Sequence, residues 1–248
     1  MFVVSLRFGK KRRKIFFSVI TVALLTALLL TLSATFNLQK NEEIAEYAGV
    51  DAYKKIIVID AGHGGEDSGA VGVNGVYEKD LNLQIANAVG DLLEKEGYLI
   101  VYTRSEDKLL YGSDENVKGL RKISDLKNRC KIAESYPDSV FVSIHMNSFG
   151  DEKYSGLQVY YSSNSEGSER LANSVQESVR DRVQQENKRK IKKGEGIYLL
   201  ENIKNDAVLI ECGFITNEEE CKKLSEKEYQ NALSFSIVCG IIEYVESK

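Results

Sequence analysis

Short apolar runs alternate with longer segments whose apolar residues recur at helical spacing, and this alternation constrains the fold more than any other feature. The runs predict strands at residues 55–60, 98–103, 140–145, 156–161 and 207–212. The helical spacing predicts helices at residues 78–96, 120–133, 165–186 and 229–245. Strands separated by helices are typical of βαβ units. We therefore expect a single α/β domain over residues 55–248, with a largely parallel twisted sheet and helices on both faces.

The N-terminal residues show a different pattern. Residues 1–14 carry six basic side chains and no acidic one, and residues 15–36 carry no charge. An uncharged stretch of this length can cross a bilayer as a helix and exceeds the apolar core of a typical secretory signal. The basic flank favours a cytoplasmic position for residues 1–14. We expect a transmembrane anchor or signal segment at 15–36 and a polar tether at 37–54.

This topology predicts where the domain lies. The positive-inside tendency places everything after residue 36 on the extracytoplasmic side of the cell membrane. Cleavage of the apolar segment would instead release the domain as a secreted protein.

The charge distribution argues against nucleic acid as a partner. Removing the six N-terminal basic residues from a total of 33 leaves 27 basic against 37 acidic side chains. Binding to nucleic acid depends mainly on Lys and Arg contacts to phosphate. The four cysteines lie beside apolar residues without CxxC spacing, which favours small buried side chains over a zinc knuckle. The sequence neither predicts nor excludes a disulfide bridge between Cys212 and Cys221.

Polar residues gather at the carboxyl ends of three predicted strands. His63 follows the first strand, His145 ends the third, and Glu211 lies in the last. Ligands of open α/β sheets bind beyond this edge. The chain has only two histidines, and both belong to this set. Their placement favours a joint metal or catalytic role over a role in packing.

Two histidines and a carboxylate, with one open position for water, are a common catalytic zinc site. The carboxylate could be Glu66, three residues after His63, or Glu78, at the start of the first long helix. The glycine-rich loop at 62–75 can fold back and deliver Glu78 to the strand edge. The spacing alone does not decide between Glu66 and Glu78 as the carboxylate ligand.

Glu211 needs a separate explanation, because an unpaired carboxylate on a buried strand costs several kcal/mol or becomes protonated. A general base beside a zinc-activated water is one explanation. A structural ion pair with Arg104 or another cation is the alternative. The chain lacks the GxSxG motif of serine hydrolases and the GK[ST] of a P-loop, which argues against those two chemistries.

Five separate blocks, in this order and spacing, closely resemble the zinc-dependent N-acetylmuramoyl-L-alanine amidases of the type 3 group. They are residues 60–70, 78–81, 103–104, 143–148 and 209–217. The resemblance implies hydrolysis of the amide between the lactyl group of N-acetylmuramic acid and the L-alanine of the peptide stem in peptidoglycan. It implies Zn²⁺ as cofactor, His63, Glu78 and His145 as its ligands, and Glu211 as the catalytic residue. It therefore favours Glu78 over Glu66.

The resemblance also suggests a biological setting. A membrane-tethered catalytic domain without a wall-binding repeat is similar to the CwlD-type amidases of the spore cortex, which implies a role in sporulation and germination. The expected partners are peptidoglycan glycan strands with peptide stems, and the membrane through the N-terminal helix.

The chain departs from the family pattern at two backbone-shaping positions. The family often has proline where this chain has Ala61 and Asp206. Some relatives carry a helical insertion that blocks zinc until an activator binds. The interval between His145 and Glu211 is fully used by a strand, a helix and a short strand, so we expect no such plug. The need for an activating protein stays open.

The role of Asn147 and two rival functions also stay open. Asn147 could bind substrate, orient His145, or serve only as a turn-forming residue after a strand. A zinc peptidase that acts on stem peptides through Glu66 is the first rival function. A non-catalytic wall-binding protein is the second.

Overall fold

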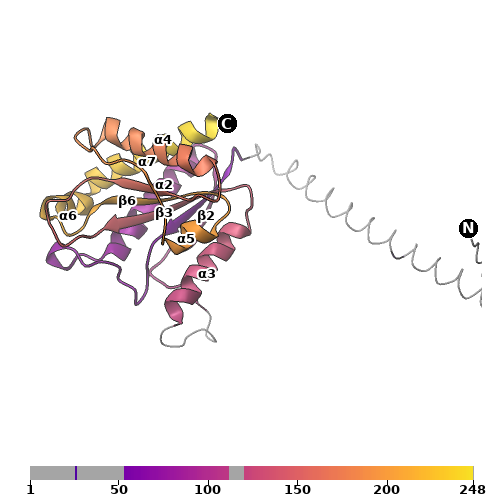
Figure 1. Cartoon of the computed structure of the whole chain (residues 1–248), viewed down its shortest axis with the longest axis horizontal. Coiled ribbons are helices and arrows are strands. Elements are labelled where there is room, and N and C mark those ends of the chain that lie inside the picture. Colours follow the sequence, from indigo (N-terminus) through magenta and orange to yellow (C-terminus); the bar gives the residue numbers. More distant parts are fainter. Residues whose placement is uncertain (1–25, 27–52, 112–119, 248) are drawn as a thin grey trace, which may run out of the picture. The chain divides into compact units, whose positions relative to one another are not determined.

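The computed structural model describes residues 26, 53–111 and 120–247. The chain from Tyr53 onward forms one compact unit (Figure 1). In the described part of the chain, no helix is both long and apolar enough to span a membrane. The predicted anchor at 15–36 lies outside the described residues apart from Thr26.

A six-stranded sheet in the order β2-β1-β3-β6-β4-β5 forms the centre of the domain. Its strands are β1 (Ile56–Ala61), β2 (Leu99–Tyr102), β3 (Val140–Asn147), β4 (Gln158–Tyr161), β5 (Lys192–Lys193) and β6 (Asp206–Phe214). The pairs β1/β2, β1/β3, β3/β6 and β4/β5 are parallel, and β4 runs antiparallel to β6. The predicted α/β domain with a largely parallel sheet is confirmed.

Helices cover both faces of this sheet. They are α2 (Glu78–Lys95), α3 (Arg121–Glu134), α4 (Gly167–Arg182), α5 (Tyr198–Asn202), α6 (Glu218–Ser225) and α7 (Lys227–Glu246). Figure 1 shows α2, α4 and α7 on one side of the strands and α3 and α5 on the other. Each long helix begins within two residues of its predicted start. The end of α4 differs, because the helix ends at Arg182 whereas the prediction extended to residue 186.

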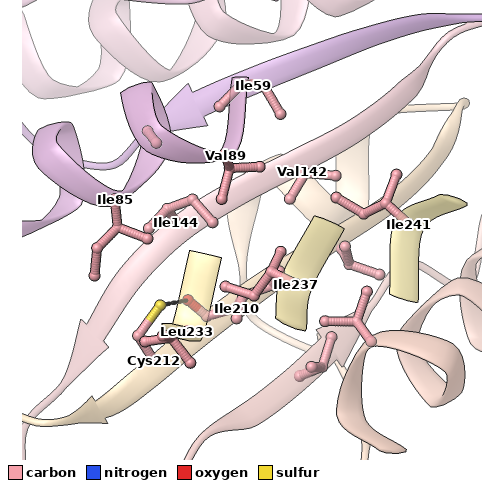
Figure 2. Packing of buried hydrophobic residues seen from close by; sticks show 14 of the residues in the cluster. Ile59, Ile85, Val89, Val142, Ile144, Ile210, Cys212, Leu233, Ile237 and Ile241 are labelled. Carbon is pink, nitrogen blue, oxygen red and sulfur yellow. Dashed lines mark hydrogen bonds between the residues drawn. The ribbon is translucent and has the colours of Figure 1, made fainter. Parts of the chain in front are cut away.

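The two faces follow from the alternation of side chains along each strand. On β1, Ile57 and Ile59 belong to the large core with α2, α4 and α7, whereas Val58 belongs to the smaller core with α3 and α5. Figure 2 shows the large core, where Ile85 of α2 and Ile237 of α7 pack over the central strands. Burial on both faces explains why the strands read as continuous apolar runs.

The helix α2 matters most for the site because its first residue is Glu78. Leu81, Ile85, Val89 and Leu93 recur every four residues and are buried, which fixes the helix against the sheet. The helix ends where Gly97 adopts a φ of 87°, a left-handed conformation that glycine takes without steric cost. This packing holds Glu78 at the carboxyl ends of β1 and β3.

Several short elements were not predicted: the 3₁₀ turn η1 (Val73–Gly75), β5, α5 and α6. Each is too short to produce a clear apolar period. All four cysteines are free thiols, so the bridge between Cys212 and Cys221 is not formed. Cys212 and Cys221 are buried, as expected for small core side chains.

Candidate active site

Two buried arginines hold the loop that follows β1. Arg129 of α3 donates from Nη2 to the carbonyl of His63 at 2.8 Å, and Arg104 donates from Nη2 to the carbonyl of Gly62 at 2.9 Å. The backbone of His63 has a φ of 62°, which is uncommon for a residue with a side chain. The arginine contacts therefore hold a strained turn that carries the first histidine.

The charge of Arg129 is balanced inside the protein. Its Nη1 lies 2.6 Å from Oδ1 of Asp60, and its Nε lies 2.7 Å from Oδ2 of Asp125. Asp60 also accepts hydrogen bonds from Thr103 and Ser143. Burial raises the pKa of Asp60, but Arg129 and these hydroxyls outweigh it and hold that pKa below its usual value. A buried, fully bonded charge network thus lies under the loop.

Glu78 is held at three points. Its Oε2 accepts from the backbone N–H of Ala70 at 2.8 Å, and its Oε1 accepts from the N–H of Met146 at 3.1 Å. The Nδ2 of Asn82, one turn along α2, lies 3.3 Å from Oε1. These contacts tie the start of α2 to the glycine-rich loop and to β3.

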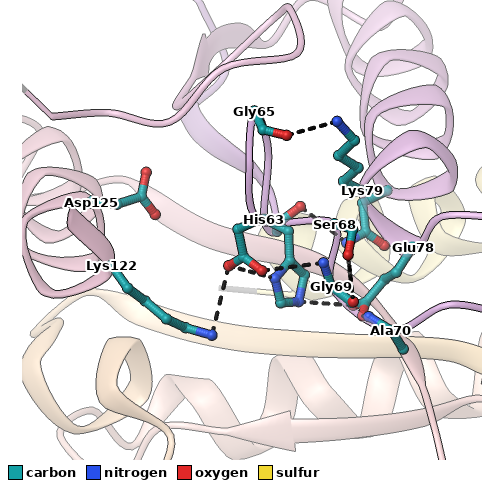
Figure 3. Close-up of polar contacts among 12 residues, drawn as sticks. His63, Gly65, Ser68, Gly69, Ala70, Glu78, Lys79, Lys122 and Asp125 are labelled. Carbon is teal, nitrogen blue, oxygen red and sulfur yellow. Dashed lines mark hydrogen bonds and ion pairs between the residues drawn. The ribbon is translucent and has the colours of Figure 1, made fainter. Parts of the chain in front are cut away.

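His63, Glu78 and His145 converge at this point. Oε1 of Glu78 lies 3.2 Å from Nε2 of His63 and 3.0 Å from Nδ1 of His145. One ligand atom from each of the three residues lies within 4.8 Å of the others. Figure 3 shows His63 from the loop facing Glu78 from α2. The structure therefore brings together the three residues that the sequence proposed as ligands.

Glycines make room for this convergence. A Cβ on Gly62 would lie 2.2 Å from the ring of His145, and a Cβ on Gly69 would lie 2.5 Å from Oε2 of Glu78. Because real Cβ atoms do not approach other atoms so closely, the functional groups can meet only if these positions lack side chains. The glycine-rich loop is thus a packing requirement of the site.

Asp67 orients the ring of His63 from the side away from Glu78. Its Oδ2 lies 2.9 Å from Nδ1 of His63, its Oδ1 accepts from the N–H of Gly69 at 3.2 Å, and Lys122 lies 3.6 Å away. A proton on Nδ1 shared with Asp67 leaves Nε2 of His63 available as a metal ligand. Histidine ligands commonly use such an outer carboxylate.

The protonation of these groups reflects their neighbours. Burial lowers the pKa of His63, but hydrogen bonds to Asp67 and Glu78 outweigh it and raise that pKa to about 9. Burial raises the pKa of Glu78, yet the bonds to His145 and His63 hold it far below its usual value. The cluster therefore holds a positive charge strongly, and a cation can take the place of the proton.

Glu211 faces the cluster from the neighbouring strand. It is the register partner of His145 between β3 and β6, so the two side chains leave the sheet on the same side. Its Oε2 is buried and hydrogen-bonds to none of the described residues. Burial, opposed by His145, raises the pKa of Glu211 to about 7. Glu211 is thus a shielded carboxylate with a free oxygen beside the three candidate ligands.

Arg104 is not the ion-pair partner of Glu211. Its Nε, Nη1 and Nη2 donate to the carbonyls of Ala61, Glu106, Gly62 and Lys79. The structural pair with Arg104 is therefore not formed, and no other cation among the described residues hydrogen-bonds to Oε2 of Glu211.

Glu66 and Asn147 lie apart from the cluster in different ways. Glu66 is exposed, and its carboxylate lies 2.5 Å from Nη1 of Arg121. Asn147 ends β3, two residues beyond His145, and its half-buried side chain hydrogen-bonds to no other described residue. Its role in binding substrate stays a prediction.

The residues present suit a zinc ion. Two imidazoles and one carboxylate are a donor set that zinc favours, and the nearby carboxylate oxygen of Glu211 has no partner among the described residues. Sequence reasoning missed two supports of this set, Asp67 and Arg129. Asp67 could have been noticed because it lies four residues after His63 and within the glycine-rich loop.

Comparisons with known proteins identify relatives of this chain. The family of N-acetylmuramoyl-L-alanine amidases matches residues 57–243. The chain is similar to the germination-specific N-acetylmuramoyl-L-alanine amidase of Bacillus subtilis (strain 168), with 38% identity over 78% of this chain and 81% of that protein.

Solved structures of amidases are similar to this chain as well. The CwlD amidase of Clostridioides difficile, solved in complex with the GerS lipoprotein, has 38% identity and a TM-score of 0.75 over 78% of this chain and all of that chain. The catalytic domain of the amidase CwlV from Bacillus (Paenibacillus) polymyxa has 34% identity and a TM-score of 0.65 over 78% of this chain and 99% of that chain. The resemblance inferred from sequence is confirmed, and the chain belongs to the N-acetylmuramoyl-L-alanine amidase family.

Proposed function

We propose that this protein hydrolyses the amide bond between the lactyl group of N-acetylmuramic acid and the L-alanine of the peptide stem in peptidoglycan. Membership of the amidase family supports the reaction. The observation that carries the proposal is the convergence of His63, Glu78 and His145 beside the unpartnered carboxylate oxygen of Glu211.

Nε2 of His63, a carboxylate oxygen of Glu78 and Nδ1 of His145 would hold a zinc ion, because these atoms face one another. Bound zinc supplies Lewis acidity, which polarises the amide carbonyl and lowers the pKa of water. Asp67 keeps the ring of His63 in the tautomer that leaves Nε2 free of a proton.

Glu211 moves the proton during the reaction. Its free Oε2 accepts a proton from the attacking water, whose oxygen forms a bond to the carbonyl carbon. Glu211 then passes this proton to the leaving nitrogen as the carbon–nitrogen bond breaks. The products are a free lactyl carboxyl group and a peptide with a new L-alanine N-terminus.

Product analysis tests this assignment. We would digest soluble muropeptides with the purified protein and identify the products by mass spectrometry, with Glu211→Gln as the matched control. A lactyl carboxyl and an L-alanine N-terminus are expected, and the variant should release neither. Cleavage within the stem would support the rival zinc peptidase. Binding of muropeptides without cleavage would support a non-catalytic wall-binding protein.

We extend the proposal to the site of action, which we infer from the charge pattern of the N-terminal residues. Residues 1–14 lie in the cytoplasm, 15–36 form the anchor, 37–54 form the tether and 55–248 form the catalytic domain on the extracytoplasmic side. Fractionation of cells that express the full chain tests this topology. Full-length protein in the membrane, cut by external protease, is expected. A shortened form in the medium would show cleavage and secretion instead.

The setting is the spore cortex. The support is the similarity to a germination-specific amidase and to the CwlD amidase that was solved with a lipoprotein. Spores that carry Glu211→Gln should keep uncleaved stems on their cortex muramic acid and germinate poorly. Normal cortex composition in such spores would contradict this role. Activity of the purified protein alone would show that it needs no activating partner.

A further inference from the structure

Three aromatic rings and one arginine lie beside the catalytic strand end, and we call these four residues the aromatic–arginine shelf: Phe149, Tyr154, Phe214 and Arg189. Phe214 is the last residue of β6, three positions after Glu211, and it pairs with Asn147 of β3. The shelf therefore begins at the same edge of the sheet as the proposed zinc ligands.

The rings of the shelf form a continuous surface. Phe149 packs edge-on against Tyr154 with 4.9 Å between ring centroids, and Tyr154 stacks on Phe214 at 6.1 Å. Phe214 is buried, whereas Phe149 and Tyr154 are 55% and 37% exposed. Large rings that remain this exposed at the carboxyl edge of the sheet are candidates for contact with a ligand.

Arg189 is fixed over these rings. Its guanidinium carbon lies 4.4 Å from the ring centroid of Phe214 and 5.9 Å from that of Tyr154. Its Nε donates to the carbonyl of Ser155 at 2.8 Å, and its Nη1 donates to Oε1 of Gln158 at 3.1 Å. Because the guanidinium is already oriented, a ligand would lose little side-chain entropy in binding it.

The charge of Arg189 has no carboxylate within ion-pair distance among the described residues. Arg121, Arg129 and Arg180 each pair with a carboxylate at 2.5–2.7 Å. The Nη2 of Arg189 donates no hydrogen bond to the described part of the chain. A half-buried guanidinium with a free nitrogen matches an incoming carboxylate, which it can hold through paired hydrogen bonds.

A cleft of about 900 Å³ extends from the shelf, with Tyr154 and Arg189 in its wall. Lys153, Lys188 and Lys223 add positive charge to the same wall, and Glu186 and Glu219 add negative charge. The carboxylate of Glu220, also in the wall, accepts from the backbone N–H groups of Gly156 and Phe214, and its charge interacts with that of Arg189 without an ion pair between them. The cleft is large enough for several residues of a peptide.

We propose that the shelf is the subsite for the peptide stem, and that Arg189 binds a stem carboxylate. This inference rests on the proposed amidase function. In the intact substrate the lactyl carboxyl is part of the scissile amide bond, and the N-acetylated sugars carry no charge. The free carboxylates of the substrate therefore belong to the stem. An unpaired guanidinium therefore selects the stem rather than the glycan strand.

The test compares two soluble substrates. One is a disaccharide peptide with free stem carboxylates, and the other is the same compound after its carboxylates are converted to amides. Wild type should show at least a tenfold higher kcat/KM for the free acid. Arg189→Ala should remove this preference by raising KM for the acid, with little change for the amide. Arg189→Lys should retain part of the preference for the free acid. Arg182 is an exposed arginine on α4, and Arg182→Ala should behave as wild type.

Other outcomes would overturn the subsite. Equal kcat/KM of wild type for the two compounds would do so, even if Arg189→Ala proved unable to fold. So would an equal loss on both compounds in Arg189→Ala. If Tyr154→Ala lowers kcat/KM for both compounds while Arg189→Ala leaves both values unchanged, the rings bind sugar instead. If wild type cleaves neither compound, the proposed function fails, and calorimetric binding of the acid against the amide still decides the subsite.

Discussion

Replacement of Asp60 by asparagine removes one charge from the buried network beneath the active-site loop. Asp60 is fully buried and lies 2.6 Å from Arg129, 2.6 Å from the hydroxyl of Thr103 and 2.5 Å from that of Ser143. Asparagine keeps the shape but leaves Arg129 with Asp125 as its carboxylate partner. Removing one partner of a buried ion pair costs about 3–5 kcal/mol.

This free energy converts into a melting temperature. Each kcal/mol shifts the midpoint by roughly 2–4 °C in a domain of this size, so Asp60→Asn should melt about 6–20 °C lower than wild type. The assay is thermal unfolding of the full chain in detergent, followed by circular dichroism. Glu66→Gln, which removes an exposed ion pair with Arg121, is the matched control and should melt close to wild type.

The same variant has a defined pH dependence. The folded-state pKa of Asp60 is held below 3.8, so its carboxylate stabilises the fold above that pH and loses this effect as the pH falls through the folded value. The difference in unfolding free energy between wild type and Asp60→Asn should therefore shrink at acid pH. A difference that grows below pH 3.8, or a melting temperature within about 2 °C of wild type at neutral pH, would refute the network argument.

Three further variants test the site itself. Asp67→Ala should weaken zinc binding by about 10–100-fold, measured by competition with a chelator, because the ring of His63 loses its outer carboxylate; unchanged affinity would show that Asp67 is not a positioning residue. Gly62→Ala should abolish activity and zinc binding, because its Cβ would meet the ring of His145, and an active, zinc-loaded variant would contradict the packing argument. Glu211→Gln should lower kcat by at least about 100-fold while zinc content stays the same, as expected for a proton-transfer group; loss of the metal together with activity would make Glu211 a ligand instead.

Much of the fold could be predicted because its elements are long and strongly patterned. The spacing of Leu81, Ile85, Val89 and Leu93 indicates α2, and these residues do pack against the sheet. The antiparallel direction of β4 could not be predicted, because a short alternating run reads the same in both orientations. The short helices α5 and α6 have too few residues to establish a period.

The site could be predicted in part. His63, His145 and Glu211 stand out because each lies at a strand end, where parallel strands present their residues to a ligand. The choice of Glu78 over Glu66 needed the family resemblance, since it depends on how the glycine-rich loop folds back. Contacts that involve the backbone, such as Arg129 with the carbonyl of His63, leave no pattern along the sequence.

Zinc content of the purified full chain, measured by mass spectrometry after dialysis, tests the central claim most directly. The account predicts one zinc per wild-type chain, loss of that zinc in Glu78→Gln, and full retention in Glu66→Gln. Retention of zinc in Glu78→Gln together with its loss in Glu66→Gln would contradict the proposed metal centre.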